Sequence, residues 1–323
     1  MARRIRKFRQ KAVQDTGFGS NASGRFVNKD GFANVEKRGV NILNRFSWYH
    51  TLMEFSTTRF LSYMFLGYLL INLVFAIIYY FIGIEHLTGI DKFSPLQEFI
   101  DVFFFSSQTF TTVGYGRIAP VGFLASLVAT LEAFLGLLGF AIATGLFFGR
   151  FSRPRAFLKF SKVALIAPYQ EVTALMFRMA PYKNNALTDG EVILTAAIET
   201  NENGETKSNF YNLNVELRKI NTLSLNWTVV HKIDEDSPFY GFTEEDFQDK
   251  DTDIEIIVQI RAFDEVFANT VVQRTSYINS EIIYGAKFVK MYDSSEDQKT
   301  TILDLSKIND YQKAELPKIV SES

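Results

Sequence analysis

Residues 94–120 read SPLQEFIDVFFFSSQTFTTVGYGRIAP, and this stretch decides the fold. Ser94-Pro95 favours the start of a helix, because proline fits the first turn, where its missing N–H leaves no hydrogen bond unmade. The apolar run from Leu96 to Phe110 has about fifteen residues, too few for a bilayer that needs ~20. A helix of this length at membrane depth is re-entrant. Non-helical backbone after it is tolerated only where it is buried in protein or lines water.

Two long apolar segments flank this stretch. Residues 60–83, FLSYMFLGYLLINLVFAIIYYFIG, contain no charge. At ~1.5 Å per residue they reach ~36 Å, enough to span a ~30 Å hydrocarbon core. Residues 121–149 carry one ionisable side chain, Glu132, and end at Arg150. Bases precede the first segment and follow the second, so the positive-inside rule predicts two transmembrane helices with both termini in the cytoplasm.

The sequence before the first apolar segment is basic and polar. Residues 1–43 are rich in arginine and lysine but contain no apolar core followed by small residues. We therefore expect a cytosolic segment and no cleaved signal peptide. Residues 44–58 mix aromatic side chains such as Trp48 with polar ones, which predicts an interfacial amphipathic helix along the inner membrane surface.

The composition agrees with a membrane half. Of the 323 residues, 47% are hydrophobic, 32 are phenylalanine and none is cysteine. Many of the phenylalanines fall between residues 60 and 160, a distribution that a uniform soluble core would not produce. The lack of cysteine excludes a disulfide framework and a thiolate metal site. The net charge of -2 points to no particular partner, and neither a nucleic-acid nor a protein partner is predicted.

The predicted re-entrant helix leads directly into Thr111-Thr112-Val113-Gly114-Tyr115-Gly116. This hexapeptide resembles the selectivity filter of the potassium-channel family, which reads TVGYG. A pore that removes water from an ion must offer successive rings of oxygens, which the backbone carbonyls of residues 112–115 and the Thr112 hydroxyl can supply. Gly114 and Gly116 permit dihedral angles that keep these carbonyls pointing in one direction.

A ring of carbonyls around an ion requires four copies of this strand, so we expect a homotetramer. The permeant K⁺, held by filter carbonyls, is the only ion predicted, and no cofactor is expected. A chance glycine-rich turn is the alternative for the hexapeptide alone. The position of the hexapeptide between a re-entrant helix and a second span disfavours that alternative.

Two further motifs resemble the inward-rectifier potassium-channel family, and particularly its prokaryotic members. Residues 149–154, GRFSRP, resemble the basic exit of the inner helix, and residues 231–238, HKIDEDSP, closely match a signature of the cytosolic domain. The stretch 273–277, QRTSY, is also similar. The resemblance covers about residues 40–290 and implies a bacterial inner-membrane location.

Beyond residue 159 the pattern changes to short β-rich runs separated by turn-forming residues. The runs are 163–169, 171–180, 190–200, 210–218, 225–233, 252–266, 269–278 and 281–292. This spacing predicts a β-sandwich, and the resemblance implies an immunoglobulin-like, all-β cytosolic domain. The expected organisation is a basic segment (1–43), an interfacial helix (44–58), a two-span pore domain (59–154), the sandwich (155–292) and a tail (293–323).

A four-residue spacing places Gly136, Phe140, Thr144 and Phe148 along one slowly drifting face of the second span, which predicts that they line the pore. The alternative is that these residues face lipid or the first span. The resemblance favours Phe148 as the gate, where four apolar side chains would close the pore by dewetting. Strong rectifiers of the family carry an acid where Phe140 stands, so only weak block by polyamines or Mg²⁺ is expected.

Three residues are expected to support the filter: Thr111, Gln108 and Glu132. Glu132 is the acid within the second span, and a hydrogen-bonded role behind the filter is favoured over direct contact with ions. Gln108 stands where relatives often carry a filter-supporting acid, which leaves Arg117 without the partner expected at that position.

Five bases around the end of the second span are expected to meet anionic lipid head groups. They are Arg150, Arg153, Arg155, Lys159 and Lys162. Charge that only sets topology is an alternative of equal weight. The resemblance also assigns Ala268, Asn269 and Thr270 to a narrow cytosolic aperture of the ion path.

Two other kinds of function were weighed. A non-selective two-span cation channel is disfavoured by the intact TVGYG. A membrane-tethered enzyme is disfavoured because the β-rich half lacks a phosphate loop, a nucleophile elbow and a His-rich metal spacing. The sequence therefore predicts a potassium channel and not an enzyme.

Overall fold

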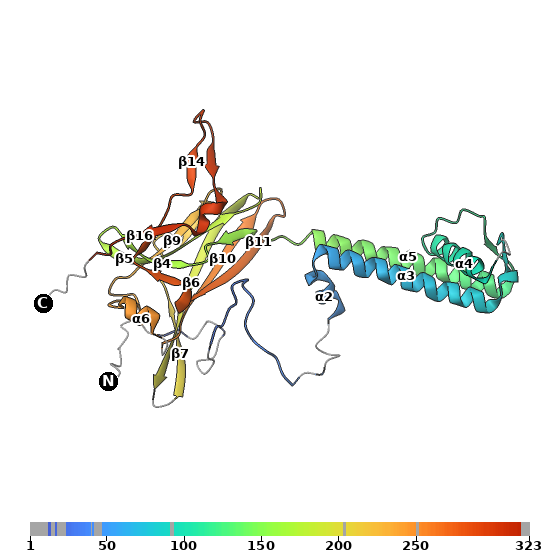
Figure 1. Cartoon of the computed structure of the whole chain (residues 1–323), viewed down its shortest axis with the longest axis horizontal. Coiled ribbons are helices and arrows are strands. Elements are labelled where there is room, and N and C mark those ends of the chain that lie inside the picture. Colours follow the sequence, from blue (N-terminus) through green and yellow to red (C-terminus); the bar gives the residue numbers. More distant parts are fainter. Residues whose placement is uncertain are drawn as a thin grey trace. The chain divides into compact units, whose positions relative to one another are not determined.

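The computed structural model describes residues 12, 13, 17, 24–39, 41, 47–90, 94–202, 205–249 and 252–317. The chain divides into two compact units (Figure 1): Arg38–Arg153, and Met1–Lys37 together with Pro154–Ser323. Much of the basic segment predicted at 1–43, and residues 44–46 of the predicted interfacial helix, lie outside the described residues.

Four α-helices form most of the described part of the membrane unit. They are α2 (Trp48–Glu54), α3 (Thr57–Ile82), α4 (Pro95–Phe110) and α5 (Phe123–Phe151). Both α3 and α5 are long and apolar enough to cross a membrane, which confirms the two predicted spans. Only 17% of the most apolar window of each is buried within the chain, so lipid or other copies of the chain must cover the rest.

The re-entrant helix α4 starts as the sequence predicts. Ser94 is the N-cap, its hydroxyl accepts a hydrogen bond from the Gln97 N–H at 3.3 Å, and Pro95 occupies the first turn. Around α4, the 3₁₀ turn η1 (Ile84–His86) leads into β1 (Leu87–Thr88), which pairs with β2 (Ala119–Pro120). Buried side chains of α3 and α4, including Tyr79 and Phe105, pack together and hold α4 in place.

The second unit is built around two five-stranded sheets. The first sheet contains β6 (Leu187–Glu202), β7 (Glu205–Asn212), β8 (Lys219–Thr222), β10 (Ile254–Asp264) and β11 (Asn269–Ile278). The second contains β3 (Leu158–Phe160), β4 (Ala164–Tyr169), β5 (Val172–Pro181), β9 (Trp227–Lys232) and β12 (Ile282–Tyr284). The short elements α6 (Glu244–Gln248) and η2 (Asn279–Glu281) lie between these strands in the sequence.

A single core joins the two sheets and confirms the predicted β-sandwich. Phe177 of β5 and Val229 of β9 share this core with Val258 of β10 and Tyr277 of β11. In β10 the buried positions alternate with more accessible ones over much of its length, as expected of a strand with one face on a core. The sequence runs predicted most of these strands but missed the short β3 and β8, and the run 210–218 overlaps β7 only at residues 210–212.

The signature at 231–238 forms a tight turn over this core. His231 is buried, with Nδ1 2.6 Å from the Asn214 carbonyl oxygen and Nε2 2.8 Å from the Ser237 hydroxyl. Burial lowers the pKa of His231. The Asp234 carboxylate accepts a hydrogen bond from the Asp236 N–H at 3.2 Å, so this acid has a turn-forming role.

The segment predicted as a separate tail, 293–323, belongs instead to the second unit. β16 (Tyr311–Lys313) pairs with β13 (Ala286–Phe288), and β15 (Thr301–Leu303) pairs with β14 (Tyr292–Ser294). Between β15 and β16, the turn η3 (Leu305–Asn309) buries Ile308. These strands are too short and polar to carry a clear alternating pattern, which is why the sequence did not reveal them.

Arg178 of β5 fastens this C-terminal segment. Its guanidinium is buried and donates to four carbonyl oxygens, those of Val289 (2.6 Å), Ile308 (2.8 Å), Asp310 (3.0 Å) and Lys307. The guanidinium carbon also lies 4.4 Å from the centroid of the Phe288 ring. Burial lowers the pKa of Arg178 to about 10, so the side chain stays charged at neutral pH.

Part of the N-terminal segment packs on the first sheet. We call residues 24–34 the N-terminal hook. Its Phe26 and Val27 are buried against Ala197 and Phe210. The buried Glu255 carboxylate accepts the backbone N–H groups of Phe26 at 2.5 Å and Val27 at 3.0 Å.

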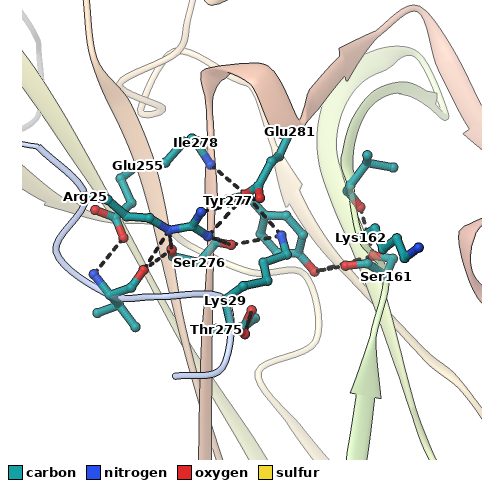
Figure 2. A network of polar contacts seen from close by, with 12 residues as sticks. Arg25, Lys29, Ser161, Lys162, Glu255, Thr275, Ser276, Tyr277, Ile278 and Glu281 are labelled. Atoms are coloured by element: carbon teal, nitrogen blue, oxygen red, sulfur yellow. Dashed lines mark hydrogen bonds and ion pairs between the residues drawn. The ribbon is translucent and has the colours of Figure 1, made fainter. Parts of the chain in front are cut away.

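Two bases complete the attachment of the hook (Figure 2). Arg25 and Lys29 approach the Glu281 carboxylate to 3.3 and 3.1 Å, and both donate to the Ser276 carbonyl oxygen at 3.0 Å. The Lys29 ammonium also lies 3.8 Å from the centroid of the Tyr277 ring. The hook is thus held by a buried carboxylate at one point and by partly exposed ion pairs at another.

We expect Glu255→Gln to loosen the hook, because the amide places an N–H donor where an acceptor is required. Leaving a buried donor unsatisfied costs ~1–3 kcal/mol, which predicts roughly tenfold or faster trypsin cleavage at Arg25 and Lys29 of the folded protein. Glu281→Gln removes only partly exposed ion pairs and should cost less than ~1 kcal/mol. Equal cleavage rates for the two variants would contradict this account.

We expect Arg178→Lys to release the C-terminal segment, since an ammonium cannot reach four carbonyls arranged for a planar fork. A loss of ~2 kcal/mol lowers the midpoint of thermal unfolding by about 4–8 °C. Hydrogen exchange at 286–317 should also become faster. Lys159→Gln is the matched control, because exposed Lys159 makes a single 3.2 Å hydrogen bond to the Leu305 carbonyl of the same segment. An equal effect of both substitutions would exclude a special role of Arg178.

Candidate functional site

The backbone that follows α4 has an unusual conformation. Gly114 and Gly116 have φ angles of 50° and 80°, as the sequence predicted, and Thr112 also has a positive φ of 60°. A residue with a Cβ rarely adopts this region, and glycine adopts it freely. Successive positive φ values prevent the strict alternation of carbonyl directions that an ordinary strand shows.

The carbonyl of Gln108 fixes the start of this backbone. It accepts the N–H groups of Val113 at 2.9 Å and Gly114 at 3.2 Å, while the Thr112 N–H donates to the Thr109 carbonyl at 3.0 Å. The Thr111 hydroxyl donates to the Ser107 carbonyl at 2.8 Å. The last turn of α4 therefore supports the segment through its main chain, and Gln108 takes part through its carbonyl.

The same segment is open to its surroundings within one chain. Val113 is 53% exposed and Tyr115 is 80% exposed, so neither side chain packs closely inside the protomer. Backbone carbonyls exposed at membrane depth require further protein or water around them.

Behind the segment, a buried polar cluster joins α3, α4 and α5. Glu132 of α5 accepts a hydrogen bond from the Tyr79 hydroxyl at 2.7 Å and contacts the Ser106 hydroxyl of α4. That Ser106 hydroxyl also lies 3.2 Å from both the carbonyl and the side-chain oxygen of Asn72. Glu132, Ser106 and Asn72 are each 0% exposed, so these bonds hold three helices together away from solvent.

Two further contacts fix the end of α4. The Tyr68 hydroxyl of α3 contacts the Ser107 hydroxyl, and Gly136 of α5 lies directly against the Phe110 backbone. A Cβ at position 136 would stand 1.9 Å from the Phe110 carbonyl oxygen. Only glycine allows α4 and α5 to approach this closely.

Gly136 is therefore buried against α4 and does not belong with the predicted pore-lining residues. The four-residue spacing explains the error. Each step of four residues rotates ~40° about the helix axis, so Gly136 and Phe148 differ in direction by about 120°. Phe140 and Phe148 are both 74% exposed, and the Thr144 hydroxyl donates to the Phe140 carbonyl at 2.9 Å.

Arg117 was expected to lack the acidic partner that relatives often carry at position 108. Its guanidinium instead lies 3.9 Å from the carboxylate of Asp101, a buried residue on α4. Asp101 lies two turns before Gln108 in the same helix, and no pattern in the sequence indicated this pairing.

The basic residues predicted to meet lipid head groups differ in their surroundings. Arg150 is partly buried, and its guanidinium donates to main-chain carbonyls at the end of α2. The Lys159 ammonium donates to the Leu305 carbonyl. Arg153, Arg155 and Lys162 are exposed. Arg150 is thus bound to main-chain groups within the protein, and its contact with lipid head groups stays a prediction.

The predicted aperture residues form the tip of the β10–β11 hairpin. Ala268 has a positive φ of 47°, and Asn269 and Thr270 are exposed at the start of β11. The buried Asp264 carboxylate accepts the N–H groups of Val266 at 2.9 Å and Phe267 at 3.2 Å. The acid shapes a tight loop that presents Val266, 74% exposed, at its tip.

Within the described ranges, the structure contains no group of three or more His, Asp or Glu side chains that could hold a metal ion. The chemistry offered at 111–116 is that of backbone oxygens and hydroxyls. Carbonyl oxygens suit hard cations held without a change in covalent bonding.

Sequence comparisons bear on the same regions. Residues 158–323 match the family model for the inward rectifier potassium channel C-terminal domain, and residues 67–153 match the model described as ion channel. The inward rectifier potassium channel Kirbac3.1 of Paramagnetospirillum magnetotacticum is 34% identical over 291 residues, which cover 88% of this chain and 95% of that protein.

Two vertebrate proteins are more distant. The ATP-sensitive inward rectifier potassium channel 12 of Gallus gallus is 27% identical and covers 85% of this chain and 68% of its own length. The G protein-activated inward rectifier potassium channel 4 of Mus musculus is 26% identical, with 82% and 67% covered. With two membrane-spanning helices, a β-rich C-terminal domain and these matches, the chain belongs to the inward-rectifier potassium channel family, a family of membrane channels and not of enzymes.

Proposed function

We propose that this protein conducts K⁺ selectively through a pore formed by four copies of the segment 111–116. The observation that carries the proposal is the backbone after α4, where Thr112, Gly114 and Gly116 all have positive φ. Such a backbone can direct consecutive carbonyls to one side, and rings of these oxygens replace the hydration shell of an ion. K⁺ is the permeant species, and no resident cofactor is needed for this chemistry.

A fourfold arrangement is supported by what one chain leaves uncovered. A single strand cannot surround an ion. Val113 and Tyr115 are also largely exposed within one protomer. Neighbouring copies would cover these side chains and the exposed faces of α3 and α5. A homotetramer with both termini in the cytoplasm of a bacterial inner membrane is therefore proposed, with no nucleic-acid or protein partner.

The proposed gate is Phe148, near the end of α5 that precedes the basic exit. Four phenylalanines at a narrow point would exclude water and stop ions by dewetting. Phe140 and Thr144 line the path above it, and the absence of a carboxylate at Phe140 supports weak block by polyamines or Mg²⁺. The hairpin tip at 268–270 forms the cytosolic aperture. Exposed Arg153, Arg155 and Lys162 are proposed to meet anionic head groups.

We expect Gly114→Ala to abolish selective uptake of rubidium, used as a tracer for K⁺, into vesicles containing the purified protein. A residue with a Cβ in the left-handed backbone conformation costs ~1–2 kcal/mol. In a tetramer this cost arises in all four subunits, at the ring of carbonyls that residue 114 forms. Wild-type uptake should be blocked by barium and persist against excess sodium.

The matched control is Gly67→Ala in α3, where an added Cβ meets nothing within 4 Å and uptake should be unchanged. Equal uptake of sodium and rubidium by the wild type would instead indicate a non-selective pore. If the wild type conducts neither ion, Phe148→Ala tests whether the pore is closed at the gate, and continued absence of flux would overturn the proposal.

We expect Glu132→Gln to preserve selectivity and Glu132→Leu to reduce it. An amide offers one acceptor toward Tyr79 and one donor toward Ser106, whose hydroxyl already has the Asn72 oxygens within reach. Leucine leaves the buried Tyr79 hydroxyl without its acceptor, at ~1–3 kcal/mol, whereas the Ser106 hydroxyl keeps the Asn72 oxygens within reach. The measurement is the ratio of rubidium to sodium uptake in tetramers of verified size. Identical ratios for the two variants would show that the cluster does not support the filter.

A further inference from the structure

The interfacial helix α2 has little to stabilise it on its own. It contains seven residues, and its last turn contains no basic side chain. Isolated helices of this length do not persist in water, and the carbonyls of a last turn require partners. Something outside α2 must therefore satisfy its C-terminal end.

Arg150 of α5 supplies these partners. One guanidinium nitrogen, Nη1, donates to the carbonyls of Leu52 at 3.2 Å and Met53 at 3.4 Å, and Nη2 donates to the Phe55 carbonyl. A positive charge also interacts favourably with the C-terminal end of a helix. Arg150 therefore caps α2 from a position about a hundred residues later in the chain.

Packing around Arg150 reinforces this attachment. Its guanidinium carbon lies 5.1 Å from the centroid of the buried Phe60 ring. The preceding residue, Gly149, lies so close to α2 that an added Cβ would stand 2.8 Å from the Tyr49 hydroxyl oxygen and 3.5 Å from Met53 Cε. Met53 is 2% exposed, so one side of α2 is buried against α5.

We propose that Arg150 is a positioning residue that fastens the C-terminal end of α2 to the cytoplasmic end of α5, and that it is not a ligand of lipid head groups. Phe148 precedes Arg150 by two residues, so the fastening holds α2 to the same turn of α5 that carries the gate. This link to the gate rests on the proposed function, whereas the fastening itself does not.

The two roles make opposite demands on the side chain. A lipid ligand needs positive charge, which lysine also provides. A cap that reaches three carbonyls from one rigid plane needs the guanidinium fork, which lysine lacks. Arg150→Lys and Arg150→Gln should therefore behave alike if Arg150 is a cap, and differently if it is a lipid ligand.

The chain contains no cysteine, so Met53→Cys gives a single thiol per subunit at the buried face of α2. In tetramers reconstituted into vesicles, we expect Arg150→Gln and Arg150→Lys each to raise the rate of thiol modification by a water-soluble maleimide roughly tenfold. Phe60→Leu, which leaves the charge intact, should raise it less and in the same direction. Arg153→Gln removes a neighbouring exposed charge and should leave the rate unchanged.

Rubidium uptake by the same variants is compared in neutral and anionic vesicles. For Arg150→Gln and Arg150→Lys, the ratio of uptake in anionic to neutral vesicles should stay within about twofold of the wild-type ratio, because the cap does not depend on lipid charge. An unchanged thiol rate in both Arg150 variants would overturn the proposal. The proposal would also be overturned if the ratio of uptake in anionic to neutral vesicles fell in Arg150→Gln and returned to the wild-type value in Arg150→Lys. Absence of uptake by the wild type would count against the proposed function alone, since the thiol rates do not depend on conduction.

Discussion

The arrangement around α4 depends on one constraint, that backbone polar groups at membrane depth need partners. The α4 helix ends inside the unit, and the chain continues as the non-helical segment 111–116. The Gln108 carbonyl satisfies two of its N–H groups, but exposed carbonyls remain. Only water, ions or further copies of the chain can satisfy them. The close approach of Gly136 to Phe110 and the Glu132 cluster keep α4 rigid, so that these carbonyls have a defined direction.

Backbone groups also find partners in a second way, at three places in the chain. In each, one charged side chain binds main-chain groups of a segment far away in sequence. Glu255 accepts N–H groups of the N-terminal hook, Arg178 donates to carbonyls of the C-terminal segment, and Arg150 donates to carbonyls at the end of α2. These segments are short, and each buries only a few apolar side chains, such as Phe26 and Val27 of the hook, Met53 of α2 and Ile308. A charge-assisted bond to the main chain fixes their position where hydrophobic burial is insufficient.

Local patterns in the sequence were enough to predict the helices, most strands and the positive φ of Gly114 and Gly116. Each of these depends on residues close together: apolar runs, the Ser94-Pro95 start and glycine itself. The partners of Arg117, Arg178 and Glu255 could not be predicted, because a single charged residue has no period and its partner lies elsewhere. Gly136 shows a different limit. A four-residue spacing resembles one helix face over two steps, but the accumulated rotation moves its first member onto another face.

The chain connections between the two units differ in length, and this bounds how each can transmit a displacement. Residues 152–157 join α5 to β3 and can extend to about 20 Å, whereas residues 35–47 join the hook to α2 and can extend to about 45 Å. A short connecting segment transmits a displacement of one unit to the other. A longer segment transmits it only when it is already fully extended. Arg150, just before the short connection begins, donates to main-chain carbonyls at the C-terminal end of α2, so the longer connection reaches this end of α5 through α2.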